Sequence, residues 1–489
     1  MGKRHLDGGA FVLEFRPMDI IAFLESVDAF LWGPPMIIVL LGTHLFLTVR
    51  LRGIQRKIPK AIRLSVKDDE GAEGDVSNFG ALVTALAGTI GTGSIVGVAT
   101  AIISGGPGAV FWMWLTGVFG IATKYTEVYA SIKYRVKDHK GEMIGGAMYA
   151  WKRAFARKDG STPWWASLGA VAFALFAAIA TLGTGSAVQS SAMTGIICGN
   201  FEGLPTWAVG LVISALVALV IFGGVQSISR VCELLVPIMA VLYAGGCIVI
   251  MVLNAPYLGE TFATIFECAF TPKAAFGGAV GSGMVTALQF GCARGLFSNE
   301  SGLGTAPIVA AAASSKNPAR QSLIASTGTF WSTVVICLIT GIVLVSTMLA
   351  HPDIVTSGNL SQGADLANAA FATIPWIGVP ILVVGMVSFA YSTILGWSYY
   401  GSRCVTFLFG KHAVLPYQVL YVLVGLLGAV GVGDVIWTVC DIGNALMAIP
   451  NITLILLLSG QIARETRHYV YDGHLDETVV EDIPRYEDK

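Results

Sequence analysis

The chain has 489 residues, of which 54% are apolar and only 12% are charged. An ordinary soluble domain carries about 25% charged residues, and so little charge cannot coat the surface of a soluble protein this large. The net charge of −1 argues against a nucleic-acid partner, because proteins that bind nucleic acid carry a strongly basic patch. The composition therefore excludes a soluble enzyme, a disordered chain and a collagen-like fibre, and it indicates a polytopic membrane protein.

Apolar residues gather into stretches long enough to cross a bilayer, which takes about 20 residues in a helix. Residues 17–31 precede the first such stretch and mix apolar with acidic positions at helical spacing. They predict an amphipathic helix on the outer surface or an extension of the first span. The eleven predicted membrane-spanning helices are 34–50, 78–104, 109–133, 165–198, 207–224, 229–253, 279–312, 318–349, 376–409, 416–432 and 435–460.

Basic residues alternate between successive loops and set the predicted orientation. The loops at 50–67 and 133–158 are rich in Lys and Arg, whereas those at 199–206 and 350–375 contain neither. Because cytoplasmic loops carry the excess of Lys and Arg, we expect a multi-pass protein of the cell (inner) membrane with its N-terminus outside. The acidic residues 461–489 then predict a solvated cytoplasmic tail.

The ten spans that follow the first one divide into two sets of five. These sets occupy residues 78–254 and 279–460 and are nearly equal in length. An odd number of spans in each set places the second set upside down relative to the first, as in transporters built from inverted repeats. We therefore predict an all-α fold in which residues 1–77, with the amphipathic segment, the first span and a basic loop, precede a 5+5 inverted repeat.

The first span of each half contains residues that interrupt a helix. In 78–102, an apolar run is broken by glycines and hydroxyl residues at similar depth, namely Gly88, Thr89, Gly91, Thr92, Gly93, Ser94 and Gly97. Such residues allow a helix to unwind inside a bilayer, because its freed backbone groups still find partners. Freed N–H groups suit a carboxylate, and freed carbonyls suit a cation. Close packing of small residues against another helix would give the same pattern.

The corresponding span of the second half carries Arg294 and Glu300 near its middle. Ionisable groups at membrane depth are costly and typical of functional sites, although a structural Arg–Glu pair is an alternative. Lys124 and Glu127 are spaced i,i+3 and predict an ion pair near the inner interface.

The ninth span offers hydroxyl oxygens of the kind that bind a hard cation. Ser388 lies one turn before the adjacent Ser392 and Thr393, and Thr393 shares a helix face with Trp397. Ordinary hydrogen bonding between helices is the alternative interpretation. In the fourth span, Ser186 and Gln189 lie on the same helix as two glycines and are candidates for lining a cavity.

These stretches resemble the alanine/glycine:cation symporters, which are sodium-coupled amino-acid carriers of bacteria and archaea. The resemblance extends from about residue 78 to residue 455 and implies the leucine-transporter fold with one extra N-terminal helix. The motifs that carry it are NFGALVTALAGTIGTGSIVGVATAI, GGPGAVFWMWLTGVFGIATKYTEV, ARGLFSNESGLGTAP, AYSTILGWSYYG and DIGNALMAIPN.

Carried over by these motifs, and with the hydroxyl pattern above, the resemblance implies a substrate site and a Na⁺ site. The implied substrate contacts are Thr89, Gly91, Thr92, Gly93, Ser94, Leu182, Ser186, Gln189, Phe297, Asn299, Thr393 and Trp397. The implied Na⁺ contacts are Gly88, Gly91, Ser388, Ser392 and Thr393. Na⁺ enters as a co-transported ion, and neither an organic cofactor nor an obligate protein partner is implied.

Three positions depart from the usual motifs of these symporters. The family usually has Asn, Phe and Asn where this chain has Ser94, Leu182 and Ser186. If these positions line the cavity, their smaller side chains make the pocket roomier and accommodate a substrate larger than alanine.

The sequence thus predicts a sodium-driven importer of a small neutral amino acid such as alanine or glycine, working by alternating access, and not an enzyme. A proton-coupled carrier of the same fold is the first alternative and would use Glu300 or Asp441. An intramembrane aspartyl protease is a distant alternative, because residues 431–434 read GVGD. That chemistry needs a second membrane carboxylate, and the nearest YD dipeptide lies in the predicted tail.

Overall fold

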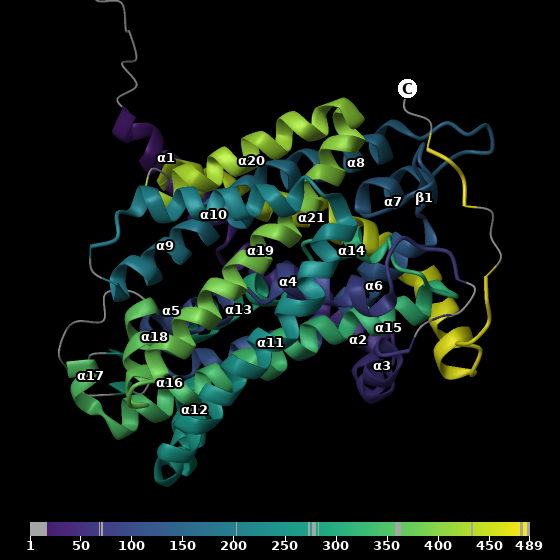
Figure 1. Ribbon diagram of the computed structural model, residues 1–489. Coiled ribbons are helices and arrows are strands. Elements are labelled where there is room, and N and C mark those ends of the chain that lie inside the picture. The colour runs from purple at the N-terminus through teal and green to yellow at the C-terminus, as the bar shows by residue number, and fades with distance from the viewer. Residues whose placement is uncertain are drawn as a thin grey trace, which may run out of the picture.

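The computed structural model describes residues 17–67, 69, 72–201, 203–271, 274–275, 280–281, 283–356, 363–431, 434–479 and 483–486. Within these residues the chain is a bundle of long helices that run roughly side by side (Figure 1). The GVGD residues Val432 and Gly433 lie outside the described part of the chain.

Two helices precede the first predicted half. The first, α1 (Pro17–Leu31), is separated from α2 (Pro34–Arg50) by a two-residue turn. Pro34 suits the start of α2, where a backbone N–H has no helical partner. In the turn, Trp32 donates its indole N–H to the carbonyl of Asp441 at 3.2 Å, which attaches α1 to the last long helix. The segment 17–31 therefore forms a separate helix with a fixed neighbour.

The helices of the first half follow a short basic connection that contains η1 (Ile54–Lys57) and α3 (Ile58–Ser65). The first and third spans of this half are irregular. A 3₁₀ turn divides the first span, and a π-helical segment joins the two parts of the third. The elements are α4 (Asn78–Thr89), η2 (Thr92–Ser94), α5 (Val96–Gly105), α6 (Ala109–Lys133), α8 (Trp164–Ala180), η3 (Thr181–Ala187), α9 (Val188–Asn200), α10 (Thr206–Ile221) and α11 (Gly224–Leu253). The antiparallel hairpin β1 (Val136–Lys137) and β2 (Met143–Ile144), followed by α7 (Ala147–Ala154), connects α6 to α8.

The second half repeats the interruption of its first span. Its elements are α13 (Met284–Asn299), α14 (Ala306–Ala310), α15 (Pro318–Thr329), η6 (Phe330–Cys337), α16 (Leu338–Ala350), α19 (Gly378–Phe409), α20 (Val414–Ala429) and α21 (Asp434–Thr466). The connecting elements are η4 (Ala255–Tyr257), α12 (Leu258–Phe270), β3 (Ala274–Ala275), β4 (Val280–Gly281), α17 (Pro352–Thr356), α18 (Gly363–Ala372), η7 (Lys411–Ala413) and η8 (Arg467–Tyr471).

Seven helices in the described part of the chain are long and apolar enough to cross a membrane, and two shorter helices, α5 and α10, are also apolar. The divided spans α4/α5 and α13/α14 have no single helix of that length, because the interruption splits each of them. Each of the eleven predicted stretches nevertheless contains a helix or a divided helix. The multi-pass architecture is confirmed, whereas the count of eleven spans and the boundaries of the two halves stay predictions.

Small residues let the divided helices pack closely against their neighbours. A Cβ atom added at Gly295 of α13 would lie 3.1 Å from the Cα atom of Met113 in α6. A Cβ atom added at Gly117 of α6 would lie 2.7 Å from a methyl carbon of Thr333. This close approach of backbones is typical of helix packing in membranes, where small residues take the place of a hydrophobic driving force.

Residues near the end of the chain bind to the side of the bundle that carries the Lys- and Arg-rich loops, which we call the basic end. Asn317 donates its amide to the carbonyls of Leu475 and Glu477 at 2.8 and 2.9 Å, and the N–H of Val479 donates to Lys316. Leu475 is only 2% exposed. Backbone hydrogen bonds and a buried leucine therefore fix this part of the tail to the bundle, whereas the acidic side chains of Asp472, Asp476 and Glu477 are exposed. The cytoplasmic tail stays a prediction.

A buried ion pair joins the first basic connection to α15, and its loss should destabilise the fold. Arg320 Nε lies 2.7 Å from Asp69 Oδ1, and the Asp69 side chain is fully shielded from solvent. We expect Asp69→Ala to lower the free energy of unfolding by about 3 kcal/mol, because it removes the buried partner of the guanidinium and leaves only the exposed Asp476 as its counter-charge. Thermal unfolding of the detergent-solubilised protein measures the effect.

Asp476→Ala is the matched control, because Asp476 also pairs with Arg320, at 2.6 Å, but its side chain is 86% exposed. Exposed pairs contribute about 0–1 kcal/mol. Equal losses of stability in the two variants would contradict the importance of the buried pair.

Candidate functional site

A cavity of about 20 Å³ lies where the interrupted helices meet in the middle of the bundle. Five separate parts of the chain line it: the end of α4 with the turn after it, the region of η3 and α9, the end of α13 with the loop after it, α19, and α21. The lining residues are Gly88, Thr89, Gly91, Gly93, Thr184, Gln189, Phe297, Glu300, Leu303, Thr393, Trp397 and Asn444.

At the first interruption, α4 ends at Thr89 and the helix resumes as α5 at Val96. Between these two helices, Gly91 leaves no room for a side chain because residues of α19 and α9 lie against it. A Cβ atom there would be 2.6 Å from Thr393 Oγ1 and 3.4 Å from Gln189 Oε1. At Gly93, a Cβ atom would be 3.1 Å from the ring of Phe297. The glycines thus let the unwound backbone border the cavity, as the sequence predicted, and they also allow close packing.

Gln189 ties the unwound segment to the fourth predicted span. Its Oε1 accepts a hydrogen bond from the hydroxyl of Thr92 at 3.0 Å, and the N–H of Thr92 lies 3.5 Å away. Its Nε2 donates to the carbonyl of Thr184 at 3.2 Å. Thr184 belongs to the π-helical segment η3, whose irregular backbone leaves this carbonyl available. One amide side chain therefore joins two non-α segments.

The second interruption is a tight loop between α13 and α14. Three of its residues have positive φ angles, which are 52° at Glu300, 101° at Gly302 and 79° at Gly304. A positive φ is uncommon for a residue with a side chain. At Glu300 it turns the chain so that the carboxylate borders the cavity, where Oε1 accepts from Trp397 Nε1 at 3.1 Å and Oε2 accepts from Thr305 Oγ1 at 2.6 Å.

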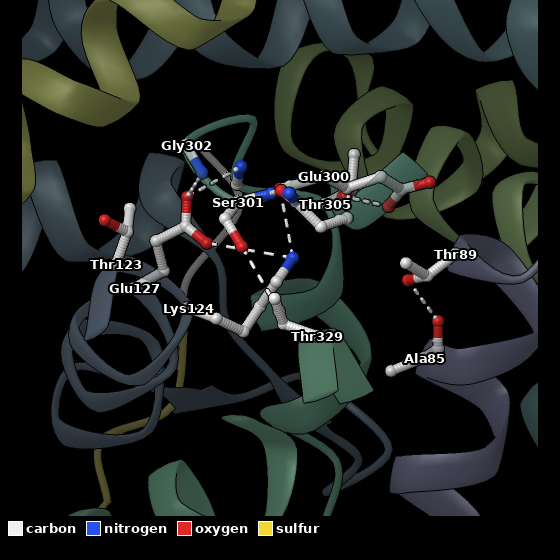
Figure 2. A network of polar contacts seen from close by, with 12 residues as sticks. Ala85, Thr89, Thr123, Lys124, Glu127, Glu300, Ser301, Gly302, Thr305 and Thr329 are labelled. Carbon is white, nitrogen blue, oxygen red and sulfur yellow. Dashed lines mark hydrogen bonds and ion pairs between the residues drawn. The ribbon is translucent and has the colours of Figure 1, made fainter. Parts of the chain in front are cut away.

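Two charged side chains of α6 hold this loop in place (Figure 2). Lys124 donates its ammonium to the carbonyl of Glu300 at 3.0 Å and lies 3.9 Å from Glu127 Oε2. Glu127 Oε1 accepts from the N–H groups of Gly302 and Gly304 at 2.8 and 3.2 Å, and from the amide of Asn451 at 2.6 Å. Both side chains are buried, so the freed backbone groups have charged partners in place of water.

The predicted pair of Lys124 and Glu127 thus forms, and both side chains also bind the backbone of the loop after α13. The alternative of an Arg294–Glu300 pair is wrong, because among the described residues Glu300 bonds to Trp397 and Thr305, whereas Arg294 borders cavities nearer the end of the bundle where α1 lies. The cost of a charge at membrane depth is the sequence signal that points to Lys124 and Glu127 as well as to Glu300.

On α19, one aromatic residue bridges the two interruptions. The indole N–H of Trp397 lies 3.1 Å from the carbonyl of Gly88 and 3.1 Å from Glu300 Oε1. One turn earlier, Thr393 Oγ1 lies 2.9 Å from the carbonyls of Ala87 and Phe389. The side chains of α19 therefore face the carbonyl end of α4, where the helix leaves acceptors free.

Comparison with known proteins agrees with this arrangement. The chain matches the sodium:alanine symporter family over residues 18–481. It belongs to that family. The sodium/alanine symporter AgcS of Methanococcus maripaludis is 44% identical over 92% of this chain and 98% of its own length. The probable sodium/glutamine symporter GlnT of Bacillus subtilis is 31% identical over 90% of this chain and 88% of its own.

A solved structure supports the fold of this symporter-family member. The crystal structure of MhsT in complex with L-phenylalanine aligns with a TM-score of 0.55 and 16% sequence identity, covering 79% of this chain and 90% of that one. The predicted leucine-transporter type of architecture is thereby confirmed. The family membership leaves the intramembrane-protease alternative without support.

The structure brings most of the predicted site residues of this symporter together. Thr92 reaches the site through Gln189, and the predicted residues that line the cavity directly are Gly88, Thr89, Gly91, Gly93, Gln189, Phe297, Thr393 and Trp397. Of the other lining residues, Thr184, Leu303 and Asn444 were not predicted as contacts. Thr184 enters through the backbone geometry of η3, and Asn444 comes from α21, within the motif DIGNALMAIPN.

The other predicted residues lie beside the cavity and face different neighbours. Ser94 Oγ lies 3.3 Å from Ser298 Oγ, and Ser186 donates to the carbonyl of Tyr421 in α20 at 2.7 Å. Asn299 Oδ1 accepts from the N–H of Ser301, and Ser392 donates to the carbonyl of Phe389. Neither Leu182 nor Ser388 borders the cavity.

This placement corrects the expected effect of the three small residues. Ser94, Leu182 and Ser186 do not line the cavity, so their reduced size does not widen it. A roomier pocket at these positions is not present in the structure.

Substitution of Gly91 tests whether the cavity between the two interruptions is the transport site. In Gly91→Ala the new methyl group would lie 2.6 Å from Thr393 Oγ1, so we expect uptake to fall by more than about tenfold, since a distance this short is strongly repulsive. The control is Gly97→Ala, where a Cβ atom would meet no atom within 4 Å. Similar uptake by both variants in proteoliposomes would argue against a role for this cavity.

Proposed function

We propose that this chain imports a small neutral amino acid such as alanine or glycine together with Na⁺, by alternating access. The observation that carries the proposal is the cavity itself, which lies between two interrupted helices and is bordered by freed backbone groups, a carboxylate and two aromatic rings. A site of this kind recognises both ends of an amino acid. The proposal is supported by membership of the sodium:alanine symporter family and by 44% identity to AgcS.

In the proposed complex the two charged ends of the amino acid meet opposite kinds of group. The carboxylate faces the backbone N–H groups of residues 91–93, just before the positive end of α5. The ammonium faces the carboxylate of Glu300. Asn299, which the family resemblance implies as a substrate contact, is less suited to this role because its Oδ1 accepts from Ser301. Phe297, Leu303 and Trp397 surround the side chain of the substrate.

Na⁺ is proposed to bind where α4 ends against α19. The carbonyls of Ala87 and Gly88 and the hydroxyl of Thr393 lie close together there, and hard cations bind such oxygen atoms. Gly91 packs against the same hydroxyl. Ser392 is buried beside Thr393, and Ser388 lies one turn farther along. Bound Na⁺ would fix the unwound backbone and so prepare the site for the amino acid.

The size of the cavity favours the smallest amino acids. A cavity needs about 10–15 Å³ to hold one water molecule, so the cavity of about 20 Å³ must expand for any amino acid to bind. The expansion is least for glycine and alanine. Phe297 borders both this cavity and the larger ones nearer α1, and its displacement would admit a larger neutral amino acid, which is the alternative substrate class.

Proton coupling is the second candidate function. Its support is the fully buried carboxylate of Glu300, which shares the cavity with the proposed substrate. In such a carrier, protonation of Glu300 would take the place of Na⁺ binding in linking the ion gradient to transport.

Uptake of a labelled amino-acid panel into proteoliposomes tests the proposed function. We expect alanine or glycine to accumulate only when an inward Na⁺ gradient is imposed, because Na⁺ prepares the site. Accumulation that needs a pH gradient and ignores Na⁺ would support the proton-coupled alternative. Uptake independent of both gradients would overturn coupled transport, and preference for glutamine over alanine would identify the larger substrate class.

Thr393→Val tests the Na⁺ position, since it removes the hydroxyl and keeps the shape of the side chain. We expect the Na⁺ concentration for half-maximal uptake to rise by about tenfold or more, equivalent to about 1.4 kcal/mol of lost binding. Thr406→Val is the control on the same helix, because within the described part of the chain the Thr406 hydroxyl donates to the carbonyl of Ser402, one turn away on α19. An unchanged Na⁺ requirement in Thr393→Val would show that Na⁺ binds at another position.

A further inference from the structure

We propose that the cavity between α1, α13 and α21 is a second binding site for a zwitterionic amino acid, which loads there before it passes Phe297. The inference rests on the proposed function, since it concerns the route to the same central cavity. We call this space the entry site and define it by its lining residues, which are Asp28, Ala29, Trp32, Gln289, Phe290, Ala293, Arg294, Phe297 and Asp441.

The entry site is large enough for an amino acid without rearrangement. Its volume is about 280 Å³, against about 20 Å³ for the central cavity. It adjoins the central cavity at Phe297, which borders both. An amino acid bound there would lie against the same ring that borders the proposed transport site.

The charges of the entry site match a zwitterion. Arg294 supplies a guanidinium, which binds a carboxylate through two parallel hydrogen bonds. Asp28 and Asp441 supply carboxylates for an ammonium group, and both interact electrostatically with Arg294. An α-amino acid carries its two charges on neighbouring atoms and satisfies both sets at once. A simple anion or cation satisfies only one of them.

The geometry of the charged groups points to a ligand more than to an internal ion pair. Among the described residues, Arg294 forms no ion pair with either aspartate, although all three line the same space. Oδ1 of Asp28 and Oδ1 of Asp441 are shielded from solvent and have no hydrogen-bond partner in the described chain. Buried carboxylate oxygens without partners are costly, and an ammonium group would satisfy them.

The remaining lining residues suit a neutral side chain. Phe290, Ala293 and Ala29 are apolar, and the ring of Trp32 is fixed because its N–H donates to the carbonyl of Asp441. The helix α1 therefore supplies a charged group, and the turn that follows it supplies an aromatic wall. This gives the N-terminal helix a role in substrate capture, which a simple extension of the first span would not have.

The number of alanine molecules bound per chain tests the entry site directly. We expect equilibrium dialysis of the purified full-length protein with labelled alanine in Na⁺ to give two molecules per chain. The double variant Asp28→Asn, Asp441→Asn should give one, because the ammonium partners of the entry site are neutralised. One molecule per chain in the wild type would overturn the entry site and leave the proposed function intact. No binding of alanine or of any other neutral amino acid would overturn the proposed function and the entry site together.

Transport kinetics separate a binding role from a structural one. In proteoliposomes we expect Asp28→Asn and Arg294→Gln each to raise the KM for alanine about fivefold or more, with kcat and the half-maximal Na⁺ concentration within twofold of the wild type. Glu25→Gln is the matched control, because Glu25 is exposed one turn away on α1, and its KM should not change. An unchanged KM in the entry-site variants, or a fall in kcat alone, would contradict the proposal.

Discussion

A helix that unwinds inside a bilayer has to find partners for each backbone group that it frees, and this requirement shapes the centre of the molecule. Lys124 and Glu127 meet it for the loop after α13, where they bond to one carbonyl and two N–H groups. Because these contacts fix the loop, Glu300 is held in a backbone conformation that directs its carboxylate at the cavity. The indole of Trp397 then joins Glu300 to the first interruption. The cavity therefore depends on a buried ion pair that does not line it.

Much of the fold could be predicted because bilayer crossing leaves strong signals in sequence. Apolar length located the helices, and glycines at 88–93 located the first interruption. The site was harder to predict, since spacing along one helix does not tell which neighbour a side chain faces. Ser186 turns toward α20 and not toward the cavity, because the π-helical segment η3 changes the direction of the residues around it. The bound tail was missed because its contacts come from the backbone, and the polarity of its side chains suggested solvent.

The two ends of the proposed pathway are closed by different kinds of contact. At the basic end, ion pairs join separate helices and loops, including Arg403 to Glu142 at 2.9 Å and Lys411 to Asp138 at 3.2 Å. The chain end adds the ring of Tyr486, packed edge-on against Tyr149 at 5.1 Å. At the other end, the ring of Phe297 borders both the central cavity and the entry site. One side chain changes rotamer on a far shorter timescale than a set of helices separates.

This difference bears on how transport stays coupled to the ion gradient. In each of these two ion pairs one partner is largely buried, since Arg403 is 13% exposed and Asp138 is 9% exposed. Opening the basic end would break both pairs together with the contacts of the chain end. In the proposed alternating-access cycle, that cost would disfavour an arrangement open at the basic end when no ligand is bound. A ligand shifts such an equilibrium only by its preference for one state, so amino acid and Na⁺ must together favour the rearrangement that breaks these contacts. In the proposed cycle, entry past Phe297 would need only a local movement, whereas opening the basic end would need the combined preference of amino acid and Na⁺ for that state, which would oppose the passage of Na⁺ alone.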